Sequence, residues 1–138
     1  MNYRDLLISA LLVPVTVQSA CFDQASKRYG IHPDLLRAIS TVESRGNTKA
    51  TNRSNKNRSY DIGHMQINSS WLLKLAHYGI TEKSLYDLCT NTLVGAWVLA
   101  DNFKRLGYNW NAMGACTAQP TQKTVERPIA LKKIFDVA

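Results

Sequence analysis

The chain has 138 residues, of which 45% are hydrophobic and 20% are charged, the size and composition of one folded domain. These values exclude a disordered tail, a collagen-like repeat and a multidomain enzyme. Seventeen Lys and Arg against 10 Asp and Glu give a formal net charge of +7, so we expect an anionic partner: a nucleic acid, a membrane surface or an acidic polymer.

Residues 1–20 have the pattern of a secretory signal peptide. Arg4 supplies a positive start, and the apolar run that follows it, residues 6–17, is short for the ~30 Å hydrocarbon core of a bilayer. A membrane anchor is therefore the weaker alternative. Small residues fit cleavage after Ser19 or Ala20. We expect an exported protein with a mature chain of ~118 residues.

Export changes the use to which the three cysteines can be put. Cys21, Cys89 and Cys116 are too few and too far apart for zinc, whereas an oxidising compartment favours a disulfide between two of them. A Cys21–Cys89 bridge would tie the start of the mature chain to its middle. Cys116 would then be a buried small side chain or a free thiol. We expect no metal and no cofactor.

The first two predicted elements are helices. A short helix over residues 22–29 would end at Gly30. Pro33 suits the first position of a second helix that continues over residues 34–44. Its expected buried side chains are Leu35, Leu36, Ile39 and Val42.

Further helices are predicted over residues 69–78, 81–88, 92–106 and 110–118, and a last helical piece begins at Pro128. Asn68 and Asn91 would be N-caps, and Gly79 and Gly107 would end helices. The longest helix would bury an apolar stripe made of Leu93, Ala96, Trp97, Ala100 and Phe103. The fold class is therefore all-α.

A long polar segment, residues 45–61, separates the second and third helices. It contains four Asn and five basic residues, and its only acid is Asp61 at the far end. This composition predicts a surface loop. Loops of this length in a small domain are usually functional or mobile.

Glu43 lies directly before this loop, at the end of the second helix. Burial beside an apolar cleft and the negative end of the helix dipole would both favour the protonated form of a carboxyl group there. Such a carboxyl can deliver a proton to a leaving oxygen. On position alone, a solvated glutamate at a helix end is the more frequent case.

Asp61 opens the run Asp61-Ile62-Gly63-His64-Met65-Gln66-Ile67-Asn68. If this segment crosses a cleft as a strand, alternate side chains point into it. The Gln66 and Asn68 amides would then bond the hydroxyl and acetamido groups of a sugar, with Met65 and Ile67 beneath. The alternative is a turn at Gly63, a surface Gln66 and a helix cap at Asn68.

Together, these features resemble the lysozyme-like lytic transglycosylases. The resemblance is carried by Glu43-Ser44, by the run from Asp61 to Asn68, and by Cys89-Thr90-Asn91 leading into Val94-Gly95-Ala96-Trp97. It covers nearly all of residues 21–118. It is strongest to the small exported members that accompany secretion, pilus and conjugation systems.

The resemblance implies an α-helical lysozyme-like fold and periplasmic cleavage of the β-1,4 bond between N-acetylmuramic acid and N-acetylglucosamine in peptidoglycan. Glu43 would be the single catalytic acid/base, and a 1,6-anhydro ring would form on the muramoyl product. Asp61 matches a further aspartate that some related secretion-associated enzymes use; it would be a second catalytic residue that stabilises developing positive charge or orients the sugar.

The resemblance also assigns binding residues and a disulfide. Cys21 and Cys89 would be paired. The sugar subsites would be lined by Ser44, Met65, Gln66 and Thr117.

Two parts of the sequence depart from the family pattern. His64 stands where an aliphatic residue is usual, and an imidazole there would alter the cleft wall. The usual Ala-Tyr-Asn-x-Gly motif reads Ala115-Cys116-Thr117-Ala118-Gln119. Loss of the tyrosine and asparagine that normally frame the glutamate predicts impaired or altered turnover.

We therefore expect a transglycosylase domain over residues 21–119 and a divergent tail over residues 120–138. It would act as a monomer that opens the wall locally for an envelope-spanning assembly. The alternatives are a catalytically weak peptidoglycan-binding or scaffold module and a hydrolytic lysozyme. Nucleic acid is the least favoured partner, because the basic residues are scattered and no recognised binding module is present.

Overall fold

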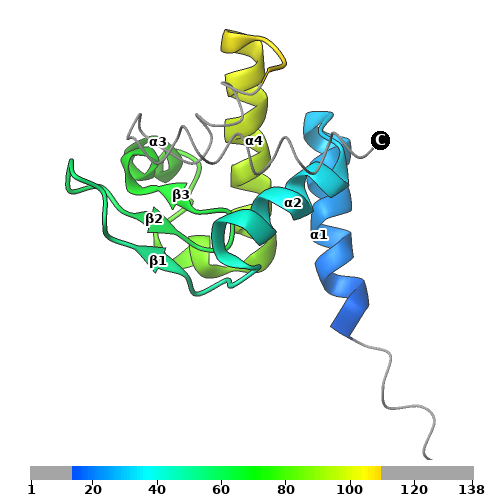
Figure 1. Cartoon of the computed structure of the whole chain (residues 1–138), viewed down its shortest axis with the longest axis horizontal. Helices are drawn as coiled ribbons and strands as arrows, with labels where there is room; N and C mark the ends of the chain where they lie inside the picture. Colours follow the sequence, from blue (N-terminus) through cyan, green and yellow to red (C-terminus); the bar gives the residue numbers. More distant parts are fainter. Residues whose placement is uncertain (1–13, 110–138) are drawn as a thin grey trace, which may run out of the picture.

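The computed structural model of the chain describes residues 14–109 (Figure 1). Within this range the fold is dominated by four helices: α1 (Pro14–Tyr29), α2 (Pro33–Ser44), α3 (Leu72–Ala76) and α4 (Leu88–Leu106). Figure 1 shows α4 in the middle, with α1 on one side and a small sheet with α3 on the other. The predicted helical fold is confirmed.

The helix α2 begins and ends as its sequence predicts. Pro33 is its first residue, and the Nδ1 of His32 accepts a hydrogen bond from the backbone N–H of Asp34 at 3.2 Å. The predicted burial of Leu35, Leu36 and Ile39 is confirmed. The prediction was wrong for Val42, which is 37% exposed, because Ser40 completes the buried face instead.

The helix α1 starts at Pro14, earlier than the predicted start at residue 22 and inside the predicted signal peptide. From residue 18 onward, where its side chains are described, Cys21, Phe22 and Ala25 are buried, whereas residues 18–20 are not. Among these described side chains, burial starts at the residue where the mature chain is predicted to begin. The signal peptide itself stays a prediction.

The helix α4 starts at Leu88 instead of the predicted residue 92. Its N-cap is Asp87, whose Oδ2 accepts from the backbone N–H of Thr90 at 3.4 Å. The prediction of Asn91 as a cap was wrong, since Asn91 is buried inside the first turn.

The apolar stripe predicted for α4 is only partly right. Its Ala96 is fully buried, whereas Leu93, Trp97, Ala100 and Phe103 are partly buried at the edge of the core.

Three two-residue strands form a small antiparallel sheet in the order β1 (Thr51–Asn52), β2 (Asp61–Ile62) and β3 (Ile67–Asn68). Ile62 pairs with Thr51 on one side and with Ile67 on the other. The polar segment 45–61 has no helix, as predicted. Its strands were not predicted, because two residues are too few to show an alternating pattern.

The predicted helix over residues 69–78 is shorter and divided in the structure. A 3-10 turn, η2 (Ser69–Trp71), precedes α3, and Asn68 caps it as predicted by accepting from the backbone N–H of Ser70 at 3.0 Å. The predicted helical turn over residues 81–88 is a second 3-10 turn, η3 (Lys83–Tyr86).

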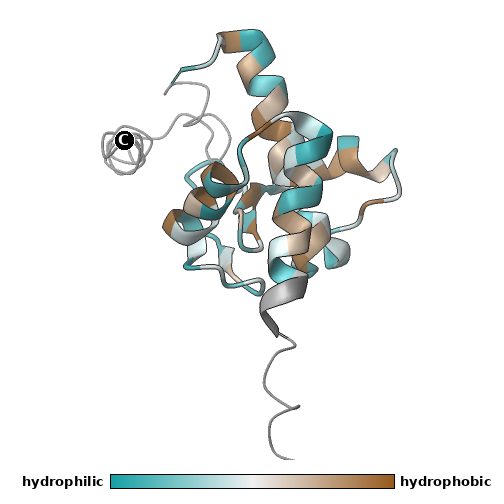
Figure 2. Ribbon diagram, turned by 90° about the vertical axis from the view of Figure 1, so that its right-hand side faces the viewer, coloured by the Kyte–Doolittle hydropathy of each residue, from teal (hydrophilic) through white to brown (hydrophobic). Residues whose placement is uncertain are grey.

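The core lies where α1, α2, α4 and the sheet meet. Figure 2 shows apolar residues recurring along the helices with hydrophilic residues between them. The largest fully buried side chains include Phe22, Leu36, Ile62, Met65 and Leu99.

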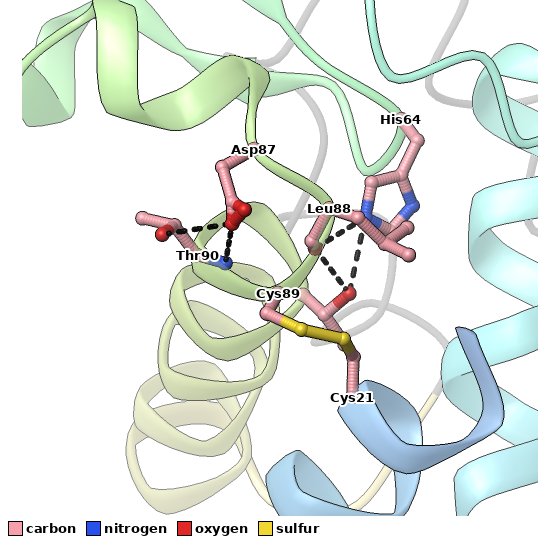
Figure 3. The surroundings of a disulfide bond; sticks show 7 residues. Cys21, His64, Asp87, Leu88, Cys89 and Thr90 are labelled. Atoms are coloured by element: carbon pink, nitrogen blue, oxygen red, sulfur yellow. Dashed lines mark hydrogen bonds between the residues drawn. A yellow bond between two sulfur atoms is a disulfide. The ribbon is translucent and has the colours of Figure 1, made fainter. Parts of the chain in front are cut away.

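A disulfide joins Cys21 of α1 to Cys89 of α4, with their Cα atoms 4.9 Å apart (Figure 3). This confirms the pairing that the resemblance implies.

Within residues 14–109, no helix combines the length and hydropathy needed to cross a bilayer.

Candidate active site

Glu43 is in the last turn of α2, one residue before the helix ends, and its side chain is partly buried. The helix stops here because Arg45 and Gly46 both adopt left-handed backbone angles, with φ of 57° and 76°. Their N–H groups bond the carbonyls of Thr41 and Ser40 at 2.9 and 3.1 Å. The chain therefore turns away directly after Glu43.

Ser44 connects this helix end to the distant run of residues 61–68. Its Oγ donates a hydrogen bond to the backbone oxygen of His64 at 2.8 Å. The two parts of the sequence that carry the resemblance, Glu43-Ser44 and the run from Asp61 to Asn68, are thus brought together. The hydroxyl of Ser44, predicted to line a sugar subsite, makes this contact within the protein.

The whole run from Asp61 to Asn68 is buried and makes a tight turn between β2 and β3. Gly63 has φ of +74°, and a Cβ atom there would overlap the side chain of Asn91 and lie 2.6 Å from the Leu85 oxygen. Only glycine satisfies both restrictions. In the alternative given for this segment, the turn at Gly63 is confirmed, whereas the surface position of Gln66 is wrong because Gln66 is buried.

Asn91 holds this turn against α4. Its Nδ2 donates to the backbone oxygens of Ile62 at 3.0 Å and Leu85 at 2.8 Å, and its Oδ1 accepts from the N–H of Met65 at 2.8 Å. Sequence reasoning missed this role by treating Asn91 as a helix cap. The presence of Asp87, a good cap residue four positions earlier, was the available signal.

Met65 and Gln66 lie within the turn. Met65 is fully buried and packs on Gly95 of α4, where a Cβ atom would approach the Met65 Cε to 2.9 Å. Gln66 is 4% exposed, and its Nε2 donates to the Gly63 oxygen at 2.8 Å. Their predicted contacts with sugar stay predictions.

Asp61 is 3% exposed and organises the asparagine-rich loop. Its carboxylate accepts from the side-chain amides of Asn52 at 3.4 Å, Asn55 at 3.2 Å and Asn68 at 2.9 Å. Asn55 and Asn68 also donate to the Ser59 hydroxyl. Asn55 belongs to the loop between β1 and β2, whereas Asn52 and Asn68 lie on the strands β1 and β3; together their amides solvate a buried carboxylate.

His64 is fully buried and faces α2 and α4, so the prediction that it alters a cleft wall was wrong. Burial is the main cause that lowers the pKa of His64 below its usual 6.5, and the hydrogen bond to the Leu88 carbonyl opposes the shift. The imidazole is therefore held in its neutral form.

Some of the predicted site residues are not among those that the structure describes. Thr117, Cys116 and the altered motif 115–119 are outside the described residues. Among residues 14–109 there is no group of three His, Cys, Asp or Glu side chains placed to hold a metal ion.

The loop next to Glu43 presents a cationic surface. All five of its basic side chains are exposed: Arg45, Lys49, Arg53, Lys56 and Arg58. Arg53 lies over the ring of Tyr60 at 4.5 Å, and the Tyr60 hydroxyl donates to Glu82 at 2.6 Å, a bond that raises the pKa of Tyr60. The loop is thus anchored while its charges face outward.

Two hollows lie on the surface of the described part. One of about 460 Å³ is lined by Lys49, Thr51, Lys83, Tyr86 and Asp87. A second of about 630 Å³ lies along α4 between α1 and the segment after α3, and its lining includes Arg28, Tyr78, Leu93 and Trp97. Glu43 lines neither of them.

Residues 20–127 match the family model described as the transglycosylase SLT domain. The chain belongs to the SLT domain family. The lysozyme-like fold predicted from the resemblance is therefore confirmed.

Relatives of this SLT domain include proteins named for invasion and for peptidoglycan. It is 37% identical over 139 residues to the invasion protein IagB of Salmonella typhimurium, covering 99% of this chain and 86% of that protein. It is 42% identical over 113 residues to the X polypeptide of Escherichia coli, covering 80% and 66%. It is 37% identical over 126 residues to a peptidoglycan-binding-like protein of Escherichia coli O157:H7, covering 83% and 75%.

Proposed function

We propose that this SLT domain is a peptidoglycan lytic transglycosylase in which Glu43 is the single catalytic acid/base. The observation that carries the proposal is the position of Glu43. It is partly buried on the last turn of α2, and the adjacent Ser44 bonds the buried turn at the His64 oxygen. A carboxyl group fixed at the edge of a core is suited to proton transfer.

The chemistry needs only one carboxyl group. Glu43 protonates the oxygen of the β-1,4 bond between N-acetylmuramic acid and N-acetylglucosamine, and the bond breaks. The resulting carboxylate takes the proton of the muramoyl 6-hydroxyl as that oxygen attacks the anomeric carbon and closes a 1,6-anhydro ring. Ordinary glycosidases use a second carboxyl group as nucleophile or base, and here the hydroxyl of the substrate replaces it.

We propose that Asp61 supports the reaction through the loop it organises. Its carboxylate is engaged by three asparagine amides, which favours a role in shaping the wall next to Glu43. Ser44, Met65, Gln66 and Thr117 complete the proposed sugar site. The exposed basic residues of the loop attract the anionic wall polymer.

The proposed setting is the periplasm, after removal of residues 1–20. There the protein opens the wall locally for an envelope-spanning secretion, pilus or conjugation apparatus. A relative named as an invasion protein supports this setting. The burial of α1 side chains from Cys21 onward supports a mature chain that begins there.

A catalytically weak peptidoglycan-binding module is the second candidate. It is favoured by the sequence Ala115-Cys116-Thr117-Ala118-Gln119, which lacks the usual tyrosine and asparagine. A relative named as peptidoglycan-binding-like also supports it.

Incubation of the purified protein with peptidoglycan, followed by mass spectrometry, separates these functions. A transglycosylase releases muropeptides with anhydro ends, which are lighter by one water than the reducing ends left by a hydrolytic lysozyme. Reducing ends alone would overturn the proposed reaction. Sedimentation with the wall but no released product, even in the Cys116→Tyr/Thr117→Asn variant, would establish the binding module.

A further inference from the structure

The imidazole of His64 links two helices that are distant in sequence. Its Nδ1 lies 2.7 Å from the Ser40 Oγ on α2. Its Nε2 lies 3.2 Å from the Leu88 oxygen and 3.1 Å from the Thr92 Oγ1 on α4. Figure 3 shows the ring beside the Cys21–Cys89 disulfide, next to Leu88.

The partners of the ring identify where its proton lies. The Leu88 carbonyl can only accept, so the Nε2 must carry the hydrogen. The Thr92 hydroxyl donates to the same carbonyl at 2.8 Å, which leaves its oxygen able to accept from Nε2–H. Nδ1 is then an acceptor, and the Ser40 hydroxyl donates to it. The neutral Nε2–H tautomer satisfies every one of these contacts.

His64 holds α2 at two points on one stripe of the helix. Its ring bonds Ser40, and its backbone oxygen accepts from Ser44, four residues later. Residues four apart lie on the same face of a helix, one turn from each other. Glu43 lies on the helical turn between Ser40 and Ser44. Holding these two residues in place therefore sets the rotation of Glu43 about the axis of α2 and its position along that axis.

We propose that His64 is a positioning residue that holds the last turn of α2, and with it Glu43, against the start of α4. The effect of this positioning on catalysis rests on the proposed function, in which Glu43 is the acid/base.

The groups that bond or stack with the imidazole carry no charge: two hydroxyls, the Leu88 carbonyl and the ring of Phe22, whose centroid is 5.9 Å away. The charged side chains on the same elements are Asp23, Lys27 and Arg28 on α1, Asp34, Arg37 and Glu43 on α2, Asp61 on β2, and Asp101, Lys104 and Arg105 on α4. An added proton on Nδ1 would reverse the direction of its bond with Ser40, because the Ser40 hydroxyl can rotate to accept from it.

The test compares Ser40→Ala, which removes the donor to Nδ1, with Thr41→Ala, a control on the exposed side of α2 whose hydroxyl bonds the Arg37 oxygen. Turnover is measured per folded molecule on soluble glycan fragments. We expect Ser40→Ala to lower kcat about 10- to 100-fold with KM nearly unchanged, because displacement of a catalytic group by about 1 Å has effects of this size. Thr41→Ala should leave both constants unchanged.

The Ser40→Ala/His64→Leu variant replaces the polar pair by an apolar one. We expect it to recover part of the lost kcat, since replacing both partners removes the unpaired polar group. Equal kcat in wild type and Ser40→Ala would overturn the proposal.

Nuclear magnetic resonance keeps the inference separate from the proposed function. Ring ¹⁵N signals should show the Nε2–H tautomer, and the ¹³C signal of the Glu43 carboxyl should shift in Ser40→Ala but not in Thr41→Ala. If the wild type has no activity, the proposed function fails while these signals still decide the positioning role. An Nδ1–H tautomer or an unmoved Glu43 signal would contradict that role.

Discussion

Asn91 and Asp61 are the buried polar side chains that fix the backbone beside Glu43. Asn91 uses both ends of its amide to join the turn after β2 to α4, and Asp61 gathers three asparagine amides beneath the loop. Both are examples of buried polar groups that are retained because every partner is satisfied. Removing either leaves several groups unpaired.

Asn91→Ala should destabilise the domain by about 3 kcal/mol, because two carbonyls and one N–H lose their partner in the core. Asn91→Asp has a side chain of nearly the same shape but should be no more stable than Asn91→Ala, since its carboxylate would face the Ile62 and Leu85 carbonyls. Urea unfolding of the two variants measures this. Wild-type stability in Asn91→Asp would show that the amide donor is unimportant.

Asp61→Asn should lower stability by about 2 kcal/mol, because an amide would be placed among three amide donors. If Asp61 acts through the loop, Asp61→Asn should lower activity and should also make the backbone amides of residues 52–60 exchange hydrogen faster. A large loss of kcat with unchanged exchange in that loop would instead favour a direct catalytic role.

At the scale of elements, the end of α2 and the start of α4 are the supports of the candidate site. The disulfide Cys21–Cys89 joins α1 to the first turn of α4, next to the carbonyl that His64 bonds. The linkage therefore fixes the first turn of α4 to α1. This arrangement makes the disulfide part of the support for the site.

Replacing both Cys21 and Cys89 by Ser should cost about 4 kcal/mol, the loop entropy expected for a separation of 68 residues. Thermal unfolding with and without a reductant measures the loss. The double variant keeps Cys116. The matched control is therefore the single variant Cys116→Ser, which keeps the bridge and should melt like the wild type. Equal melting of the double variant would show that the bridge adds no stability.

How well the elements could be predicted depended on whether local residues decide them. The helix α2 was predictable because Pro33 marks its start, the spacing of its apolar residues is helical and the polar loop marks its end. The start of α4 was not, since Asp87 and Asn91 are both good caps and only tertiary contacts choose between them. Glu43 and the run 61–68 were candidates from their residues and position, and the resemblance assigned their roles. The pairing of Ser40 with His64, 24 residues apart, has no local signal.

At the scale of the whole molecule, the described fold combines a neutral buried centre with a cationic outer loop. The formal charge of +7 is carried in part by the exposed basic residues beside the candidate site, whereas His64 stays uncharged inside. A buried neutral histidine makes folding sensitive to acid.

Acidification should destabilise the wild type more than His64→Leu. The pKa of His64 is lowered on folding, so below about 6.5 the unfolded chain binds a proton that the folded chain does not. This loss is absent above that pH and grows as pH falls toward the lowered folded pKa. Urea unfolding of both proteins between pH 7.5 and 5 measures it. A stability difference between them that does not change with pH would contradict a buried neutral imidazole.

The account depends most on Glu43 as the acid/base, and release of anhydro-muropeptides by Glu43→Gln tests this most directly. Asp34→Asn, an acid-to-amide change in the first turn of the same helix, is the matched control. We predict that Glu43→Gln folds normally but releases product at least about 100-fold more slowly than wild type and Asp34→Asn. Equal release by Glu43→Gln and wild type would contradict the account.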